Sequence, residues 1–237
     1  MNSKNIPLKD RIIFALDVDN LKEAEKWVDL LGDHINFFKV GLQLFIAEWF
    51  RPIDMIIKKG HKVMADLKIF DVPETVKLAV KQLRDRGVTF VTVHGNDPIL
   101  RAAVEVKEEL KILAVTVLTS FDESDMKEMG LTRTVEDLVF IRAEKALNLG
   151  CDGIVSSGME ASRLRRDLGD KLIIVTPGIR PGKNIEVPSD DQKRIMSPQE
   201  AIKNGADHLV IGRPIRIAKD PIALIKSMQD EMGKILF

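Results

Sequence analysis

The chain has 237 residues, of which 45% are hydrophobic, and its 36 acidic side chains balance its 36 lysines and arginines. This hydrophobic content is too high for a disordered chain, and the zero formal net charge argues against broad electrostatic binding to nucleic acid or to an anionic membrane surface. The length is close to the roughly 250 residues of one α/β barrel, so we expect residues 1–237 to form a single domain.

Short runs rich in β-branched residues alternate with longer stretches of helical periodicity along the chain. The run RIIFALDV at 11–18 predicts the first strand, and LKEAEKWVDLLG at 21–32 predicts an amphipathic helix that ends at Gly32. The same alternation continues to the last strand. The eight expected strands are residues 11–18, 36–41, 61–68, 89–95, 111–118, 152–157, 171–178 and 207–213.

A helix is expected after each of these strands. The segment PETVKLAVKQLRDRG at 73–87 is the clearest of them, because Pro73 lies in its first turn and Gly87 follows its end. Three others are expected at 21–32, between the second strand and residue 60, and after Pro98. Four more are expected between the fifth strand and about residue 149, for about eight residues between the sixth and seventh strands, at 198–204 and after residue 220.

Eight strand–helix units in this order predict parallel strands, and eight units in this length predict a closed (β/α)₈ TIM barrel. An open doubly wound sheet is the alternative, and it accounts less well for the number of strands. One stretch interrupts the alternation, namely IRPGKNIEVPSDDQKR at 179–194, which is long, polar and rich in proline and glycine. Because it follows the seventh strand, we interpret it as a functional lid.

The sequence also bears on the compartment. The single cysteine, Cys151, excludes an intramolecular disulfide, which fits a reducing environment. The first ten residues lack the apolar stretch of a signal peptide. The apolar runs IIFAL and ILAV are far shorter than the ~20 residues of a membrane-spanning helix. We therefore expect a soluble, cytoplasmic protein without a membrane partner.

Charged side chains fall at the C-terminal ends of the expected strands, where the active site of a barrel lies. Asp17 ends the first strand, Lys39 the second, and Asp66 and Lys68 the third. Side chains alternate along a strand, so Asp66 and Lys68 should face the same way, and all four could form a chain of alternating charge. Structural ion pairs are the alternative reading. Asp71, just beyond, would make the cluster net negative.

Further polar residues follow the later strands, and two of these loops predict a phosphate site. The loops TPGIRPG and IGRPI follow the seventh and eighth strands, whose loops commonly bind phosphate in barrels. Gly178 and Gly212 allow close backbone approach, and Arg213 offers a planar fork for a phosphate. Tight turns and a solvated arginine are the alternative. The other candidates are His94, Thr119, Ser120, Ser156, Ser157, Arg180 and, as a neutral donor in the expected lid, Gln192.

Seven motifs in their order resemble the short, bacterial-type orotidine 5′-monophosphate decarboxylase family. They are FALDV, FKVG, DLKIFDVPET, VTVLTS, VTPGIRP, DQKRIMSPQEA and VIGRP, and the resemblance extends from about Ile13 to Pro221. The DxKxxD pattern is shared with related phosphosugar barrels, whereas LTS and the long TPGIRP…DQKRI stretch are more specific. The resemblance implies decarboxylation of orotidine 5′-monophosphate to uridine 5′-monophosphate in de novo pyrimidine biosynthesis, without metal or cofactor.

The resemblance also implies a role for each matching residue. Lys68 would give a proton to C6 of the pyrimidine, and Asp66 would lie near the leaving carboxylate. Asp17 and Lys39 would hold the ribose hydroxyls and extend the charge chain. The family supplies the remaining catalytic position, Asp71, together with Thr75, across a dimer interface into the neighbouring site, which implies a homodimer. Thr119 and Ser120 would hold the pyrimidine edge, and the phosphate end would comprise Arg180, Gln192, Gly212 and Arg213.

One departure from the family follows the fourth strand. The family continues there with His-Ala and small residues, whereas this chain reads HGNDP, so the resemblance does not fix the shape of that loop. His94 fits either a structural role or support of the site. The other histidines, His34, His61 and His208, lie away from the expected barrel mouth, and the sequence has no cluster with metal-ligand spacing.

Two other functions remain open at this point. A magnesium-dependent relative, such as a 3-keto-L-gulonate 6-phosphate decarboxylase or a hexulose-phosphate synthase, would share the Asp-Lys-Asp geometry but would not need LTS or the long segment with Gln192. A non-catalytic barrel could bind a phosphorylated nucleotide as a sensor or scaffold. The intact Asp66, Lys68 and Asp71 argue against it, because binding alone does not need an ammonium group between carboxylates.

Overall fold

The computed structural model describes residues 5–182 and 194–236, and within them eight parallel strands close into a barrel in chain order. Each strand pairs with its neighbour in the sequence, and β8 pairs with β1. This confirms the predicted (β/α)₈ barrel. The strands are β1 (Ile12–Ala15), β2 (Phe37–Gly41), β3 (Lys62–Ile69), β4 (Phe90–His94), β5 (Lys111–Val115), β6 (Gly153–Val155), β7 (Ile173–Thr176) and β8 (His208–Ile211).

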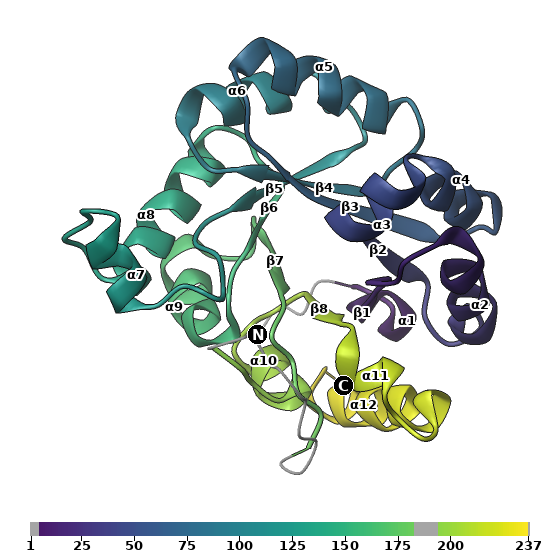
Figure 1. Cartoon of the computed structure of the whole chain (residues 1–237). Coiled ribbons are helices and arrows are strands. Elements are labelled where there is room, and N and C mark those ends of the chain that lie inside the picture. The colour runs from purple at the N-terminus through teal and green to yellow at the C-terminus, as the bar shows by residue number, and fades with distance from the viewer. Residues whose placement is uncertain (1–4, 183–193, 237) are drawn as a thin grey trace.

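The helices form a ring outside the strands (Figure 1). Loops join these helices to the C-terminal ends of the strands, so the loops meet on one face of the barrel. The helices are α1 (Leu8–Arg11), α2 (Leu21–Leu31), α3 (Leu42–Glu48), α4 (Arg51–Lys58), α5 (Pro73–Arg84), α6 (Asp97–Glu105), α7 (Glu123–Glu128), α8 (Val135–Asn148), α9 (Gly158–Leu168), α10 (Pro198–Lys203), α11 (Arg213–Arg216) and α12 (Pro221–Leu236).

Alternate residues of each strand pack on opposite sides of the barrel wall. On β1, Ile13 points inward, whereas Phe14 points outward and lies 5.3 Å from the Trp27 ring of α2. The inward layer closes the barrel interior beneath the C-terminal loops. It consists of Ile13, Phe37, Met64, Phe90, Leu113 and Val175, with Val155, Ile173 and Val210 packed against them.

Two expected helices are each divided in the structure. The segment up to residue 60 forms α3 and α4, separated at Trp49, whose φ of 53° lies in the left-handed region. Pro52 lies in the first turn of α4, and a proline cannot continue the preceding helix because it lacks the N–H donor. The segment up to residue 149 likewise forms α7 and α8, with Gly130 at a φ of 73° between them.

Smaller differences concern the element ends. The helix between β6 and β7 has 11 residues rather than about eight, and the short helices α1 and α11 were not expected. The expected lid at 179–194 lies mostly outside the described residues, but Ile179 forms an isolated parallel bridge with Met196. No helix within the described residues is long and apolar enough to cross a membrane.

Candidate active site

A cavity of about 390 Å³ opens at the C-terminal ends of the strands. Its volume is in the range of small-ligand sites. Its walls are largely apolar, and Met64, Val155 and Val210 of the inward layer contribute to its lining. Most of the residues predicted for the site line it, namely Asp17, Lys39, Asp66, Lys68, Thr119, Ser120, Arg180, Gly212 and Arg213.

The predicted chain of alternating charge is present in this cavity. Lys39 Nζ lies 3.1 Å from Asp17 Oδ1 and 3.5 Å from Asp66 Oδ2, and Lys68 Nζ lies 2.9 Å from Asp66 Oδ1. Lys39 and Asp66 are the buried middle members, with side chains 10% and 14% exposed, whereas Lys68 is 35% exposed. The outer ammonium group therefore faces the cavity while its carboxylate partner is held from behind by Lys39.

Regular strand alternation does not by itself produce the Asp66–Lys68 contact. The pairing of β3 with β4 shifts register between Ala65 and Ile69, and Lys68 has a φ of 47°. A non-glycine residue in this left-handed region costs on the order of 1 kcal/mol and needs a stabilising contact. Thr92 on β4 provides it, because its Oγ1 accepts a hydrogen bond from the Lys68 N–H at 2.9 Å and donates one to Asp66 Oδ1 at 3.0 Å.

Sequence reasoning missed Thr92. It is fully buried on β4 and bonds both the backbone of Lys68 and the carboxylate of Asp66. The available signal was a polar side chain two residues before His94 in an otherwise apolar strand, on the same face of the sheet.

The charge chain keeps its two buried middle members, Lys39 and Asp66, ionised. Burial by itself would raise the pKa of Asp66, but the ammonium groups of Lys39 and Lys68, with hydrogen bonds from Lys68 and Thr92, hold that pKa below its ordinary value. Burial would likewise lower the pKa of Lys39, but Asp66 and Asp17 outweigh it and raise the pKa. The site thus holds a carboxylate and an ammonium group side by side at neutral pH.

Ser156 and Ser157 are buried and do not line this cavity, and Asp71 and Thr75 also lie outside it. Asp71 and Thr75 are exposed in the β3–α5 region, and Asp71 Oδ1 accepts a hydrogen bond from the Val72 N–H at 2.6 Å. Neither lines the cavity of its own chain. Within one chain, the structure therefore does not bring Asp71 to Lys68 as a fifth charge of the cluster.

His94 belongs to a neighbouring cavity of about 360 Å³, which it lines with Phe70, Phe121, Met126 and Arg142. Burial, with the nearby charges of Arg142 and Lys68, lowers the pKa of His94, so its ring is neutral at pH 7. Val117 and Leu118 line both cavities. His94 thus lies beside the charged site and not within its lining.

The phosphate end combines two glycines and two arginines. Gly178 has a φ of 77°, which a side chain rarely adopts. A Cβ atom on Gly212 would lie 3.0 Å from Ala15 Cβ and 3.3 Å from Asp17 Oδ2, so glycine is needed for this loop to approach β1. Arg180 and Arg213 line the cavity here. Gln192 lies outside the described residues.

The other histidines lie away from the site, as expected. His208 begins β8 at the opposite end of the barrel, where Nδ1 lies 2.8 Å from the Asp10 carbonyl oxygen. His61 precedes β3 and lies 3.3 Å from Asn36 Oδ1. Among the described residues no group of three or more histidine, cysteine, aspartate or glutamate side chains could hold a metal ion.

Comparison with known proteins adds independent information. Residues 10–228 match the model of the orotidine 5′-phosphate decarboxylase / HUMPS family. An orotidine 5′-phosphate decarboxylase of Methylococcus capsulatus is 51% identical over 222 residues, which cover 93% of this chain and 91% of that protein. One of Nitrobacter winogradskyi is 44% identical over 96% of this chain and 95% of that protein. The crystal structure of orotidine 5′-phosphate decarboxylase from Lactobacillus acidophilus matches with a TM-score of 0.82 and 33% identity, covering 94% of this chain and 99% of that one.

Proposed function

Because the chain belongs to the orotidine 5′-phosphate decarboxylase / HUMPS family, we propose that its charged cavity performs decarboxylation with Lys68 as the acid. The chain is an enzyme, a carboxy-lyase that converts orotidine 5′-monophosphate to uridine 5′-monophosphate and CO₂ in pyrimidine biosynthesis. The family and the activity expected from the sequence motifs are therefore confirmed. The roles of individual residues form the proposal.

The observation that carries the proposal is the position of the Lys68 ammonium group. It lies at the open end of the Asp17–Lys39–Asp66–Lys68 chain, 2.9 Å from Asp66 and facing the cavity. When the bond from C6 to the carboxylate breaks, the electron pair stays on C6 in the plane of the ring, where the π system cannot spread it. A fixed cation aimed at this charge stabilises the transition state, and such preorganised electrostatics are often the largest catalytic contribution.

The proton then moves from Lys68 Nζ to C6, which forms the C6–H bond of the product and leaves a neutral amine. Lys68 is 35% exposed, so solvent can return the proton. Asp66 would lie beside the departing carboxylate and disfavour it electrostatically before CO₂ leaves. The cation that stabilises the negative charge on C6 is the Lys68 ammonium group, so the proposed reaction needs no metal or cofactor.

The remaining cavity residues would bind the rest of the nucleotide. Asp17 and Lys39 would bind the ribose hydroxyls, and Thr119 and Ser120 would bind the pyrimidine edge. Arg180, Arg213 and the backbone beside Gly212 would bind the phosphate, where a guanidinium fork suits a dianion. Gln192 belongs to this group on the family resemblance alone. Binding energy at the phosphate, remote from C6, can then contribute to the chemical step.

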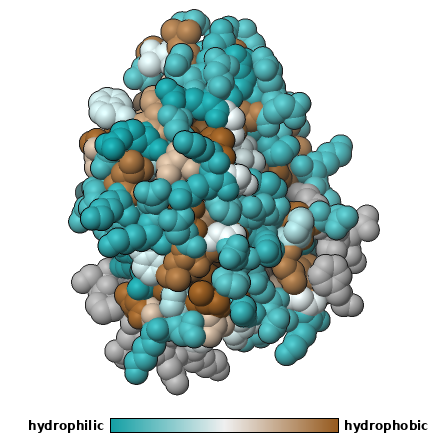
Figure 2. Space-filling model, turned by 90° about the vertical axis from the view of Figure 1, so that its right-hand side faces the viewer, coloured by the Kyte–Doolittle hydropathy of each residue, from teal (hydrophilic) through white to brown (hydrophobic). Residues whose placement is uncertain are grey.

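We also propose a homodimer in which Asp71 and Thr75 reach the neighbouring site. The face around them carries large exposed apolar side chains, which mark interaction surfaces. Figure 2 views the molecule from the side on which α2, α3 and α4 lie, and hydrophobic side chains interrupt its hydrophilic surface there. The exposed apolar residues of α3 and the β3–α5 region are Leu42, Ile46, Trp49, Phe70, Val72 and Leu78.

A cytoplasmic location and a single barrel domain complete the proposal. Cys151 is buried, and burial raises the pKa of its thiol to about 12, so the thiol stays protonated and unreactive at neutral pH. A chain with one such cysteine suits a reducing compartment. With equal numbers of acidic and basic groups, the expected partner is the small nucleotide substrate and not a nucleic acid or a membrane.

An assay of the purified protein with orotidine 5′-monophosphate, with and without EDTA, tests the function. We expect metal-independent loss of orotidine absorbance with uridine 5′-monophosphate as the product. Activity on phosphosugars that requires magnesium would instead indicate the metal-dependent relatives. Binding of uridine 5′-monophosphate without any turnover would indicate a non-catalytic barrel.

Hybrid dimers test the shared site. The Lys68→Ala and Asp71→Ala chains should each be inactive alone, and mixing them should restore activity, because each hybrid dimer then holds one site with both residues intact. If subunit exchange is verified by mass and activity does not recover, Asp71 does not act across an interface.

A further inference from the structure

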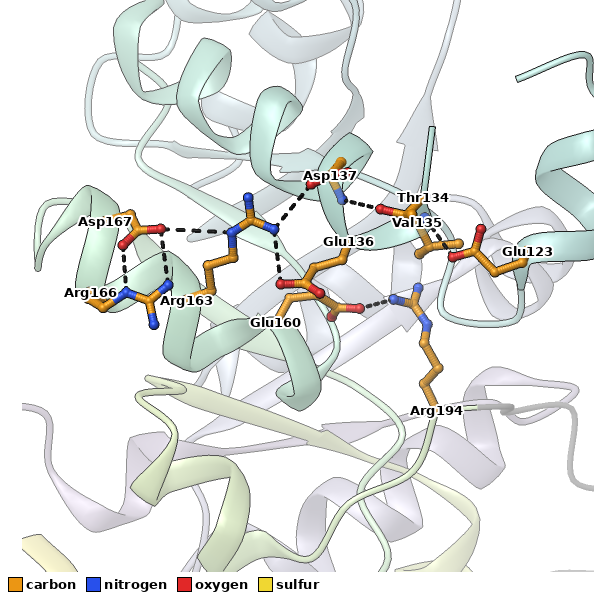
Figure 3. Close-up of polar contacts among 10 residues, drawn as sticks. All are labelled: Glu123, Thr134, Val135, Glu136, Asp137, Glu160, Arg163, Arg166, Asp167 and Arg194. Carbon is orange, nitrogen blue, oxygen red and sulfur yellow. Dashed lines mark hydrogen bonds and ion pairs between the residues drawn. The ribbon is translucent and has the colours of Figure 1, made fainter. Parts of the chain in front are cut away.

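A buried ion pair lies at the edge of the active-site cavity and has no role in the reaction described above. Arg194 Nη1 contacts Glu160 Oε1, and the two side chains are only 11% and 7% exposed. Glu160 lies in the first turn of α9, just after β6, whereas Arg194 lies in the chain between β7 and α10 (Figure 3). Burying two charges costs several kcal/mol per ion unless they are well paired.

The same pair is tied to the loop that would hold the pyrimidine. Arg194 Nη2 donates a hydrogen bond to the Leu118 carbonyl oxygen at 3.1 Å, and Leu118 lines the cavity directly before Thr119 and Ser120. Ser156, after β6, donates to Glu160 Oε2 at 3.4 Å. One guanidinium group thus joins the loops that follow β5 and β6.

On its other side, Arg194 is close in the chain to residues that support the phosphate end. Met196 accepts a hydrogen bond from the Arg180 N–H at 2.9 Å and donates one to the Gly178 carbonyl oxygen at 3.1 Å. A Cβ atom on Gly158 would lie 2.6 Å from Met196 Sδ, so Met196 packs directly against the start of α9. Residues 194–196 therefore lie between the loop at the phosphate end and the loop at the pyrimidine end.

We propose that Arg194, held by Glu160, is a positioning residue that couples the two ends of the substrate site. The inference rests on the proposed function, which places the phosphate at Arg180 and the pyrimidine at Thr119 and Ser120. Bound phosphate holds Gly178 and Arg180 in place, and their backbone hydrogen bonds hold Met196. Arg194, two residues before Met196, then holds the Leu118 carbonyl group through its own hydrogen bond. Such placement matters because small misplacements of a bound substrate cost much of the rate.

The structure offers a matched control in the same helix. Arg163 of α9 pairs with Glu136 at 3.0 Å and Asp137 at 3.2 Å, and its guanidinium lies 4.8 Å from the Phe140 ring. Figure 3 shows both arginines, with Arg163 bound to Glu136 and Asp137 and Arg194 bound to Glu160. Arg163 is 31% exposed and lines neither cavity at the barrel mouth.

The test compares the affinities of uridine 5′-monophosphate and uridine, measured by calorimetry for the wild type and for Arg194→Met, Arg194→Lys and Arg163→Met. In Arg194→Met the ratio of the two affinities should fall about tenfold, within the usual range of coupling between sites. The ratio for Arg194→Lys should lie between those of the wild type and Arg194→Met. The lysine keeps the positive charge but lacks the planar guanidinium group that reaches both acceptors. Arg163→Met should keep the wild-type ratio.

The ratio does not depend on the folded fraction, because an unfolded chain binds neither ligand. If the lone Glu160 carboxylate prevents Arg194→Met from folding, the Arg194→Met/Glu160→Gln double variant removes both charges and carries the same expectation. A ratio within about twofold of the wild type in these variants would overturn the coupling, since coupled sites differ by more than that. Turnover of orotidine 5′-monophosphate by the wild type is measured separately, so a failure of the proposed function is distinguished from a failure of the coupling.

Discussion

Charged side chains are buried at both ends of the barrel, but they bond to different kinds of groups. At the C-terminal end they bond mainly to one another, as in the contacts of Lys39 with Asp17 and Asp66. At the N-terminal end they bond to the backbone as well as to one another. There Arg165 donates to the Gly205 carbonyl at 2.8 Å and the Leu172 carbonyl at 2.7 Å, and it also contacts Asp207.

The N-terminal end also borders a cavity, of about 440 Å³, which Arg11, Arg165 and Asp207 help to line. A cavity with buried charges is therefore not sufficient to identify a catalytic site. The difference is that Asp207 accepts the Ile174 N–H at 2.9 Å and so fixes the start of β7, whereas the Lys68 ammonium group bonds only a side chain among the described residues and faces open space. A buried charge that bonds to the backbone indicates a structural role. A charge that bonds only to side chains and faces a cavity indicates a catalytic role.

The largest expected effect is the loss of activity in Lys68→Ala. Removing the ammonium group should lower kcat at least about 10³-fold, because a preorganised charge at the reacting carbon is lost. Its side chain is 35% exposed, so the free energy of unfolding should change by less than about 1 kcal/mol. Steady-state kinetics and urea unfolding measure the two quantities.

Lys62→Ala is the control at the other end of the barrel. Lys62 Nζ lies 2.6 Å from Asp10 Oδ2 and is 44% exposed, so this variant removes a comparable ion pair. Its kcat should match that of the wild type. Full activity in Lys68→Ala, or equal losses in the two variants, would remove the distinction between the two ends.

Asp207→Asn should show the reverse behaviour. Removing its charge leaves Arg165 and Arg11 without their buried counter-charge, and breaking such a pair costs about 3–5 kcal/mol of stability. We expect urea unfolding at a correspondingly lower concentration, while kcat/KM per folded molecule stays at the wild-type value. A variant that is stable but inactive would show that the N-terminal end takes part in catalysis.

The smallest expected effect is a pH dependence of stability that arises at the N-terminal end. Burial lowers the pKa of His208 to about 4, whereas the unfolded chain has an ordinary histidine pKa of 6.5. Between these values the unfolded state binds the additional proton, so stability should fall as the pH decreases from 6.5 to 4, by at most about 3 kcal/mol.

His208→Gln isolates this contribution, because the lowered pKa values of His61 and His94 act in the same direction. The glutamine amide can still donate to the Asp10 carbonyl, which His208 Nδ1 approaches at 2.8 Å. Unfolding followed by circular dichroism across this pH range should give a flatter curve for the variant. Identical slopes would mean that His208 is not the group that titrates.

Most of the charged cluster could be predicted from the sequence, because parallel strands present their C-terminal ends on one face. This rule places Asp17, Lys39, Asp66 and Arg213 around one cavity without knowledge of any long-range contact. The division of two helices was missed, because Trp49 and Gly130 take left-handed backbone conformations inside otherwise helical stretches.

The sequence by itself determined the barrel, the order of its strands and the face that carries the charges, since these follow from local periodicity and chain direction. Only the tertiary structure decided how Lys68 is held by Thr92 and that Arg194 pairs with Glu160, 34 positions away in the chain. The first depends on a register shift between β3 and β4, and the second on how the segment after β7 packs against α9. Neither is encoded in the spacing of residues along one element, because both arise where separate elements meet.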